Sequence, residues 1–213
     1  MKKMQIIAWI TFLLGIVVRL LHYPGGGTLS LLGTLLLLVH SIIYLFKNAK
    51  TNLTTSFLHL SYSVLTLYVL FRFHYWAGGV LLSLIGFFVT LFYFFLLCKN
   101  ESQLKFPQIF LVIYFVFFFV LSFTHSDRIY YFFNFYPMLN SKTRETDYNS
   151  LDKYSWFLYI ANKQDEALEA NHKAQKVIEE YLKITSDKNA AYDLELIKQH
   201  EQQIQDKSWT TYP

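Results

Sequence analysis

Long apolar runs without acidic residues constrain this chain more than any other feature. The first 100 residues contain no aspartate or glutamate, and the first acidic residue is Glu101. Each run approaches the about 20 residues with which a helix crosses about 30 Å of hydrocarbon. No Ala-x-Ala site follows the first run, so we interpret it as an uncleaved span and not as a signal peptide. The sequence predicts an all-α membrane protein with five transmembrane helices, at residues 4–21, 28–46, 54–71, 80–98 and 107–123.

The composition changes near residue 124, where charged residues become frequent. This split predicts a transmembrane domain over residues 1–125 and a small soluble helical domain over residues 147–213. The Tyr- and Phe-rich stretch 126–146 between them is expected to be an interfacial connector, because aromatic rings suit the headgroup layer. The scattered lysines argue against nucleic-acid binding. Cys98 is the only cysteine, which excludes an internal disulfide and a CxxC motif.

Lysine and arginine are unevenly distributed among the short loops. These residues favour the cytoplasmic side of bacterial membranes. The N-terminus and the second and fourth loops hold six lysines, whereas the first and third loops hold two arginines. This bias predicts a multi-pass protein of the bacterial inner membrane, with a cytoplasmic N-terminus and a periplasmic C-terminal domain. The residues are Lys2, Lys3, Lys47, Lys50, Lys99 and Lys105 on the first side, and Arg19 and Arg72 on the other.

One motif occurs twice, at an offset of 53 residues. Each copy joins two apolar runs, so the sequence predicts a duplicated helical hairpin over residues 8–46 and 61–98. The last glycine of each copy is expected to serve close helix packing. The aligned pairs are Arg19 with Arg72, Gly25 with Gly78, Gly26 with Gly79, Ser30 with Ser83, and Gly33 with Gly86.

The first copy reads Arg19-x-x-His22-Tyr23-Pro24-Gly25 and continues into an apolar run. It resembles the transmembrane hairpin of the GldL family, the inner-membrane motor component of bacterial gliding motility and type IX secretion. The likeness covers residues 8–46, and a degenerate copy covers residues 61–98. In that family a glutamate about one turn beyond the position of Gly33 carries the proton-linked function. Leu36 and Leu37 stand there in this chain, so the resemblance implies a related membrane fold without the motor activity.

The two motif turns hold the first candidate contacts. Arg19 and Arg72 lie at the outer ends of predicted helices, and snorkelling to the interface explains both. The alternative is an anion bound by the two arginines, either a lipid phosphate or a carboxylate of a partner subunit. The surrounding glycines lack a nucleotide-binding context and are expected to form sharp turns. The remaining turn residues are His22, Tyr23, Pro24, Gly25, Gly26, Tyr75, Trp76, Gly78 and Gly79.

Four histidines lie in or near the predicted spans. His40 and His59 are expected at one depth of the membrane, and His22 and His74 at another. Membrane b-type cytochromes hold two haems with histidines paired in this way. Polar contacts between helices are the other interpretation, and it needs no cofactor. The sequence therefore offers a haem-binding redox subunit as an alternative to a protein without a cofactor.

The soluble domain is predicted to contain three amphipathic helices. The first covers about 150–161, the second has Asp165 as its N-cap, and the third has Ser186. Asn162 is expected to adopt the left-handed conformation in the turn between the first two. The first helix pair resembles a tetratricopeptide repeat, at Leu158-x-x-x-Asn162-x-x-Asp165-Glu166-Ala167-Leu168 followed by Ala174, although a plain three-helix cap fits as well. A partner-binding groove is expected at Trp156, Tyr159 and Tyr181.

Catalytic motifs are absent from the sequence. It has no GxSxG and no HExxH, and no acid in residues 1–100 could orient a histidine. An enzyme is therefore not predicted. The sequence favours a non-catalytic scaffold subunit of a larger membrane complex, which binds membrane or periplasmic proteins through its soluble domain. Transport of a small solute is a weaker alternative, because the spans carry few polar groups.

Overall fold

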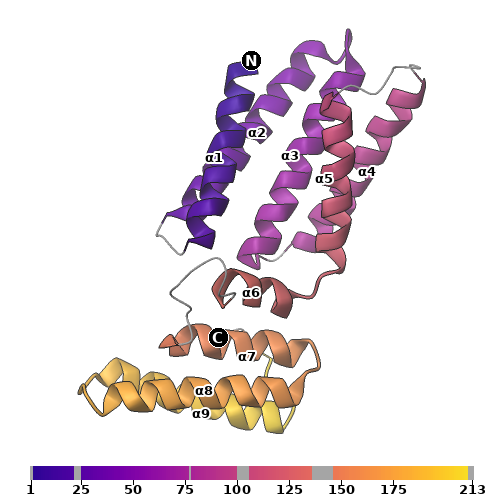
Figure 1. Cartoon of the computed structure of the whole chain (residues 1–213). Coiled ribbons are helices and arrows are strands. Elements are labelled where there is room, and N and C mark those ends of the chain that lie inside the picture. The colour runs from indigo at the N-terminus through magenta and orange to yellow at the C-terminus, as the bar shows by residue number, and fades with distance from the viewer. Residues whose placement is uncertain (1, 22–24, 77, 100–105, 136–145, 211–213) are drawn as a thin grey trace. The chain divides into compact units, whose positions relative to one another are not determined.

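The computed structural model describes residues 2–21, 25–76, 78–99, 106–135 and 146–210. Within these ranges the protein is all-α, and no strand occurs (Figure 1). The chain divides into two compact units, Met1–Thr124 and His125–Pro213. The N-terminal unit contains α1 (Lys2–Leu20), α2 (Gly26–Asn48), α3 (Leu53–His74), α4 (Gly79–Lys99) and α5 (Phe106–Phe123). The C-terminal unit contains α6 (Ser126–Asn134), α7 (Tyr148–Ile160), α8 (Gln164–Leu182) and α9 (Lys188–Gln205).

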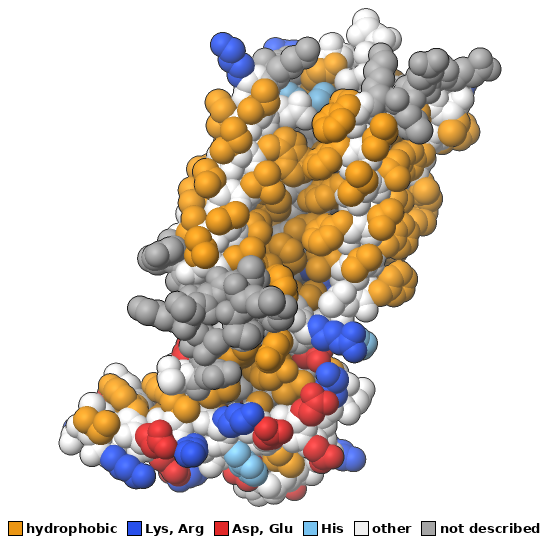
Figure 2. Space-filling model, in the orientation of Figure 1, with side chains coloured by type: hydrophobic (Ala, Val, Ile, Leu, Met, Phe, Trp, Pro, Cys, Tyr) orange, Lys and Arg blue, Asp and Glu red, His pale blue; other side chains and the backbone are white. Residues whose placement is uncertain are grey.

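All five helices of the N-terminal unit are long and apolar enough to cross a bilayer. Their outward surfaces carry half-exposed aliphatic and aromatic side chains, such as Ile10, Phe88 and Val116. In Figure 2 hydrophobic side chains cover the visible face of this unit, whereas acidic and basic side chains are interspersed over the C-terminal unit. A helix that is apolar on all sides is typical of a membrane span. The helices therefore suggest a membrane protein.

Glycines allow α1 and α2 to pack with their backbones in contact. A Cβ atom on Gly15 would lie 2.7 Å from the Cα atom of Ser30, and one on Gly26 would lie 2.9 Å from the Cα atom of Arg19. Real side chains do not approach backbone atoms so closely, so only glycine fits these positions. The position of α3 that aligns with Gly15 holds Tyr68, whose ring packs against Phe118 at 4.8 Å. The α3–α4 pair therefore lacks the close backbone contact that Gly15 allows between α1 and α2.

Helix α3 is the most buried of the five apolar helices. Its tyrosines and hydroxyl side chains form hydrogen bonds with α2 and α5. Ser63 Oγ donates to the carbonyl of Leu37 in α2 at 2.9 Å, and Tyr62 Oη donates to the carbonyl of Pro107 in α5 at 2.6 Å. Tyr114 of α5 donates to Thr66 Oγ1 at 3.1 Å. These bonds satisfy polar groups that have no water available within an apolar bundle.

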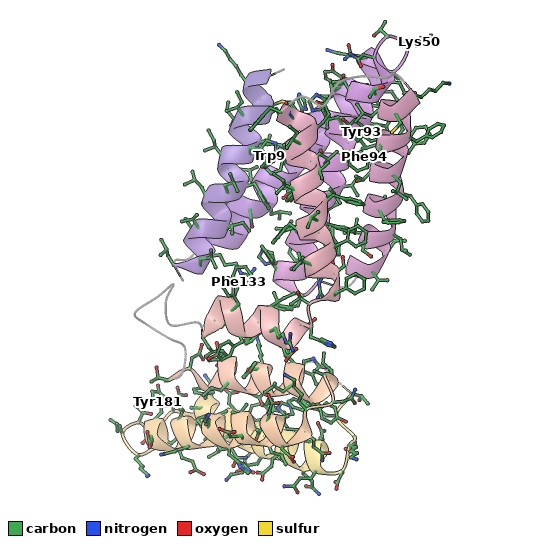
Figure 3. The ribbon with its side chains drawn as sticks, turned by 45° about the vertical axis from the view of Figure 1, so that its right-hand side comes forward. Trp9, Lys50, Tyr93, Phe94, Phe133 and Tyr181 are labelled. Carbon is green, nitrogen blue, oxygen red and sulfur yellow. The ribbon has the colours of Figure 1, made fainter. Side chains whose placement is uncertain are left out.

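Aromatic rings fill the space between α1, α3 and α5. Trp9 of α1 lies edge to face with Tyr62 at 5.7 Å and with Tyr114 at 5.8 Å between ring centroids. Figure 3 labels Trp9 among the side chains of the bundle. Edge-to-face pairs add to the energy of burial. The ring contacts therefore hold α1 against α3 and α5, in addition to its close contact with α2.

The C-terminal unit is built on the antiparallel pair of α7 and α8, with α9 packed on α8. Its core contains Leu158, Ala167, Ala170, Ile204 and Trp209. Asn162 has a φ of 60°, which confirms the left-handed turn expected between the first two helices of this unit. Two of the predicted helix N-caps differ from those in the structure. Helix α8 already begins at Gln164, and α9 is capped by Asp187, whose carboxylate accepts the N–H groups of Asn189 and Ala190.

The expected cap Ser186 is wrong by one residue, because serine and aspartate are adjacent and the carboxylate takes the capping position. Asp165, the expected cap of α8, lies within the first helical turn. A negative charge there still interacts favourably with the helix dipole. The predicted connector 126–146 begins with α6, and residues 136–145 of it lie outside the described residues.

Candidate functional sites

Both motif turns contain a glycine in the left-handed conformation. Gly25 has a φ of 89° and Gly78 a φ of 96°, values that other residues adopt only with strain. Gly25 precedes α2 and Gly78 precedes α4. The two turns thus use glycine as expected, while His22, Tyr23 and Pro24 of the first turn lie outside the described residues.

Arg19 connects the first hairpin to the second. Its Nη1 atom lies 2.8 Å from Nδ1 of His74 at the end of α3. A guanidinium group only donates hydrogen bonds, so Nδ1 of His74 is the acceptor and the imidazole is neutral. The indole of Trp76 stacks on this imidazole, with ring centroids 5.0 Å apart. Gly27 leaves room for the ring, since a Cβ atom there would lie 2.7 Å from Cε1 of His74.

Arg72 holds the end of a different helix. Its Nη2 atom donates to the carbonyl oxygens of Leu121, at 3.4 Å, and of Thr124. These carbonyls belong to the last turn of α5 and the residue after it, and the carbonyl of Leu121 also accepts the N–H of Thr124 at 3.3 Å. The aligned arginines therefore contact different groups, a histidine in one copy and a helix end in the other. The contact of either with a lipid phosphate or a partner carboxylate stays a prediction.

Replacing Arg72 with methionine is expected to loosen the end of α5. The methionine keeps the apolar stem but leaves two carbonyl oxygens without their charged donor, which costs about 1.5–3 kcal/mol per charged hydrogen bond. Hydrogen exchange measured by mass spectrometry should speed up for peptides covering residues 117–124. The matched variant Arg19→Met should leave that exchange unchanged. Equal exchange in both variants and the wild type would contradict the capping role of Arg72.

Two of the four candidate haem histidines lie in contact. The rings of His40 and His59 are 5.0 Å apart and edge to face, and the ring of Tyr44 packs against His59 at 4.5 Å. His74 is engaged by Arg19 as described, and His22 lies outside the described residues. A haem held by His40 and His59 would place its macrocycle between the two rings, so they would first have to separate. The haem hypothesis stays a prediction that this arrangement does not favour.

Metal-binding side chains do not gather elsewhere in the part of the chain that is described. Within it, no three histidine, cysteine, aspartate or glutamate side chains lie close enough to hold one ion. The single cysteine, Cys98, is exposed near the end of α4.

Of the three residues expected to form a groove, Trp156 and Tyr159 lie together, with ring centroids 6.1 Å apart, and Tyr181 does not join them. Trp156 and Tyr159 both pack against Trp209, with ring centroids 5.1 and 6.0 Å away. Tyr159 also lines a hollow of ≈ 460 Å³ together with Gln164 and Lys207. Tyr181 lies at the opposite end of α8, where its hydroxyl donates to Asp187 at 3.4 Å (Figure 3).

A different groove lies along α7 and α8 of the same unit. It has a volume of ≈ 590 Å³, within the range of protein binding sites. Aliphatic and aromatic side chains form its floor, and charged side chains of α8 form its rim. We call it the α8 groove. The floor residues are Tyr131, Phe135, Leu151, Tyr154, Leu158, Ala170 and Val177, and the rim residues are Glu166, Glu169, Lys173, Lys176 and Glu180.

Three aromatic rings meet at one end of the α8 groove. Tyr154 lies 5.7 Å from Tyr131 and 5.4 Å from Phe135 between ring centroids. Burial raises the pKa of Tyr154 to about 12, and the negative charges of Asp127 and Glu166 contribute further to this increase. The phenol is therefore neutral at physiological pH. Of these two carboxylates, Glu166 lines the groove.

An ion pair fixes α6 to the turn between α7 and α8. The ammonium group of Lys163 lies 2.9 Å from Oδ2 of the buried Asp127 and 3.6 Å from Oε2 of Glu166. The hydrogen bond to Asp127 is the main reason that the pKa of Lys163 is raised. Lys163 is thus held mainly by Asp127, and Glu166 is the more loosely paired carboxylate.

The interior of the C-terminal unit contains a second polar cluster. Asp152 and His200 are both more than nine-tenths buried, and Nδ1 of His200 lies 2.9 Å from Oδ2 of Asp152. Asn171 donates to the carbonyl of Ile197 at 3.0 Å and to Asp152 at 3.4 Å. The imidazole stacks on Trp209, 4.4 Å away. This cluster ties α7, α8 and α9 together and lies apart from the lining of the α8 groove.

Acid is expected to weaken the surface contact between α8 and α9. Oxygens of Glu201 lie 2.7 Å from Nε2 of Gln175, which donates, and 2.8 Å from Nε2 of His172. These contacts hold the pKa of Glu201 below its usual range. The stabilisation is therefore complete above the unfolded pKa of about 4.3, and it is lost as the pH falls through the lower folded pKa.

This pH dependence can be measured by hydrogen exchange of α9 in the full chain between pH 5 and 3, with rates corrected for intrinsic pH effects. Glu201→Gln should remove the part of the destabilisation that Glu201 contributes. Glu195→Gln, which removes a more exposed carboxylate of α9, is the control. Identical pH curves for the wild type and Glu201→Gln would contradict the expectation.

No family model, no curated protein and no solved structure matches the chain.

Proposed function

We propose that this chain is a non-catalytic scaffold subunit that anchors a helical protein-binding unit to a membrane. One observation carries the proposal: a groove of ≈ 590 Å³ with an apolar floor and a charged rim lies on a unit joined to five apolar helices. Floors of this kind bind the side chains of a partner, and a charged rim selects among partners. The bilayer then limits the search for that partner to proteins of the same membrane or its surface.

The distribution of lysines supports a bacterial inner membrane with the C-terminal unit in the periplasm. The likeness to GldL supports a related hairpin architecture and not the motor, because residues 1–100 hold no carboxylate to carry a proton. Both inferences belong to the proposal.

Site-specific crosslinking in native membranes tests the scaffold function. A photo-reactive residue replaces Lys176 at the groove rim, or Lys198 on the exposed side of α9 as the control. We expect the first position to crosslink a specific peptide of another protein, identified by mass spectrometry. The crosslink should disappear when Val177→Trp fills the groove. If both positions crosslink the same set of proteins, or if Val177→Trp changes nothing, the groove does not bind a partner and the proposal fails.

A further inference from the structure

Two buried aliphatic hydroxyl groups of the N-terminal unit have no hydrogen-bond partner among the described residues. They are Ser61 Oγ of α3 and Thr90 Oγ1 of α4, and both side chains are fully buried. Other buried hydroxyl groups of this unit donate to a carbonyl of their own helix, as Thr34 does to Ser30 at 2.8 Å and Thr66 does in α3 at 2.7 Å. A hydroxyl group without such a bond is costly in an apolar interior. Ser61 and Thr90 therefore need a polar partner that the described side chains do not supply.

The packing of α3 against α4 places these two hydroxyl groups at one level of the seam between the helices. A Cβ atom on Gly86 of α4 would lie 3.2 Å from Cδ2 of Leu65 in α3. Ser61 lies four residues before Leu65, and Thr90 lies four residues after Gly86. Residues four apart share a helix face. Because the two helices are antiparallel, both steps lead to the same level, and Ser61 faces Thr90 across the seam.

The first hairpin is apolar at the corresponding level. The positions that align with Ser61 and Thr90, at the offset of 53 residues, hold Ala8 and Leu37. Both are buried between the helices of their own unit. An alanine and a leucine can face each other there without any hydrogen bond. The second hairpin thus has a pair of polar groups where the first has an apolar contact.

The seam between α3 and α4 also leaves more space than the seam between α1 and α2. A Cβ atom on Gly33 would lie 2.7 Å from the Cα atom of Phe12, so the backbones of the first pair touch. At the aligned Gly86 the three nearest atoms all belong to side chains. Serine and threonine together have as many non-hydrogen side-chain atoms as alanine and leucine. The same amount of side chain therefore fills a wider gap, and space remains between the two hydroxyl groups.

We propose that a single water molecule is bound between α3 and α4, where it bridges the hydroxyl groups of Ser61 and Thr90. Two polar groups that face each other beyond hydrogen-bond distance are suitable partners for a bridging water. Water donates and accepts, so one molecule satisfies both hydroxyl groups, and carbonyl oxygens of the adjoining turns can accept its other proton. The second hairpin is thus held together in part by a polar ligand, and the first is not.

A double-mutant cycle in the full chain tests this site. Thr90→Val and Ser61→Ala each remove one hydroxyl group with little change of shape. Each should raise the unfolding equilibrium constant in mixed micelles about fivefold, as for one lost hydrogen bond, because the water then lacks one partner. The double variant has no polar pair left to satisfy, so it should unfold no more readily than either single variant. Hydroxyl groups without a water would give the opposite sign, because removing an unpaired buried polar group stabilises a protein.

A direct bond between the two hydroxyl groups would also couple the variants, so a second measurement detects the water itself. Solid-state NMR of the full chain in bilayers of deuterated lipid follows the transfer of magnetisation from water to threonine side chains. Thr34 is the matched control, because its hydroxyl is equally buried but bonds to its own helix. Thr34 lies eight residues from Gly26 and Thr90 nine residues from Lys99, the nearer helix ends, so their depths are similar.

We expect transfer to Thr90 to be faster than transfer to Thr34 and to slow down in Ser61→Ala. The inference is overturned if the single variants stabilise the chain or if their effects add in the double variant. It is equally overturned if Thr90 receives magnetisation from water no faster than Thr34 does. None of these outcomes bears on the scaffold function, which depends on the C-terminal unit.

Discussion

Gly33→Ala is expected to destabilise the N-terminal unit by about 3 kcal/mol, towards the upper end for overpacked cores. A Cβ atom on Gly33 would lie 2.7 Å from the Cα atom of Phe12 and 2.8 Å from the carbonyl oxygen of Ala8. Backbone atoms of α1 cannot move away without separating the two helices. The loss can be measured as a lower fraction of SDS needed to unfold the chain in mixed micelles.

Gly86→Ala provides a matched control at the aligned position of the second hairpin. A Cβ atom there would lie 3.2 Å from Cδ2 of Leu65 and 3.6 Å from Cγ1 of Val64, which are the ends of flexible side chains. Alanine also gains up to about 1 kcal/mol of helix propensity over glycine. Gly86→Ala should therefore leave stability nearly unchanged. Similar losses for the two variants would contradict the different packing of the two hairpins.

Asp152→Ala is expected to destabilise the C-terminal unit by about 3 kcal/mol, because a buried polar group that loses its hydrogen-bond partner costs about 1–3 kcal/mol. The change leaves the buried His200 without its carboxylate and removes an acceptor of Asn171. Protection of α8 and α9 amides from hydrogen exchange, measured on the full chain, should fall accordingly. Asp152→Asn keeps the shape and part of the hydrogen bonding, so its loss should be smaller.

His172→Ala is the matched control for the second prediction. It removes a histidine–glutamate contact of similar length, 2.8 Å to Glu201, but the histidine is more than half exposed. Exposed pairs contribute about 0–1 kcal/mol. If His172→Ala and Asp152→Ala had equal effects, burial of the Asp152–His200 pair would not determine its importance.

The five apolar helices could be predicted because each is a run without acidic residues whose length and mean hydropathy suit a membrane span. The left-handed turn at Asn162 could also be predicted, since asparagine is one of the few residues that adopt this conformation without much cost. The predicted N-cap of α9, Ser186, lies one residue before the observed N-cap, Asp187, because serine and aspartate have similar capping propensities. Which of two adjacent residues caps a helix depends on the local backbone geometry, which the sequence does not show.

The groove could not be located from the sequence because its walls come from three helices. Leu151, Tyr154 and Leu158 recur at helical spacing, which predicts only an apolar stripe on one helix. Trp209, which follows α9, packs against Trp156 and Tyr159, a contact between segments far apart in the sequence that no local pattern indicates. The sequence offers one signal for the groove, the three- and four-residue spacing of the charged residues Glu166, Glu169, Lys173, Lys176 and Glu180. This spacing places the charges on one side of a helix, but it identifies a groove rim only when the apolar floor beside it is known.

The buried polar helix α3 has a consequence for how the protein is made. Of the five apolar helices, α3 has the lowest mean hydropathy and the largest fraction of buried residues. Ser56, Ser61 and Ser63 all lie inside the bundle. A segment of this kind partitions poorly into lipid alone. We expect α3 to stay beside the insertion machinery during synthesis until the more apolar α4 emerges from the ribosome, so that both enter the bilayer as a pair.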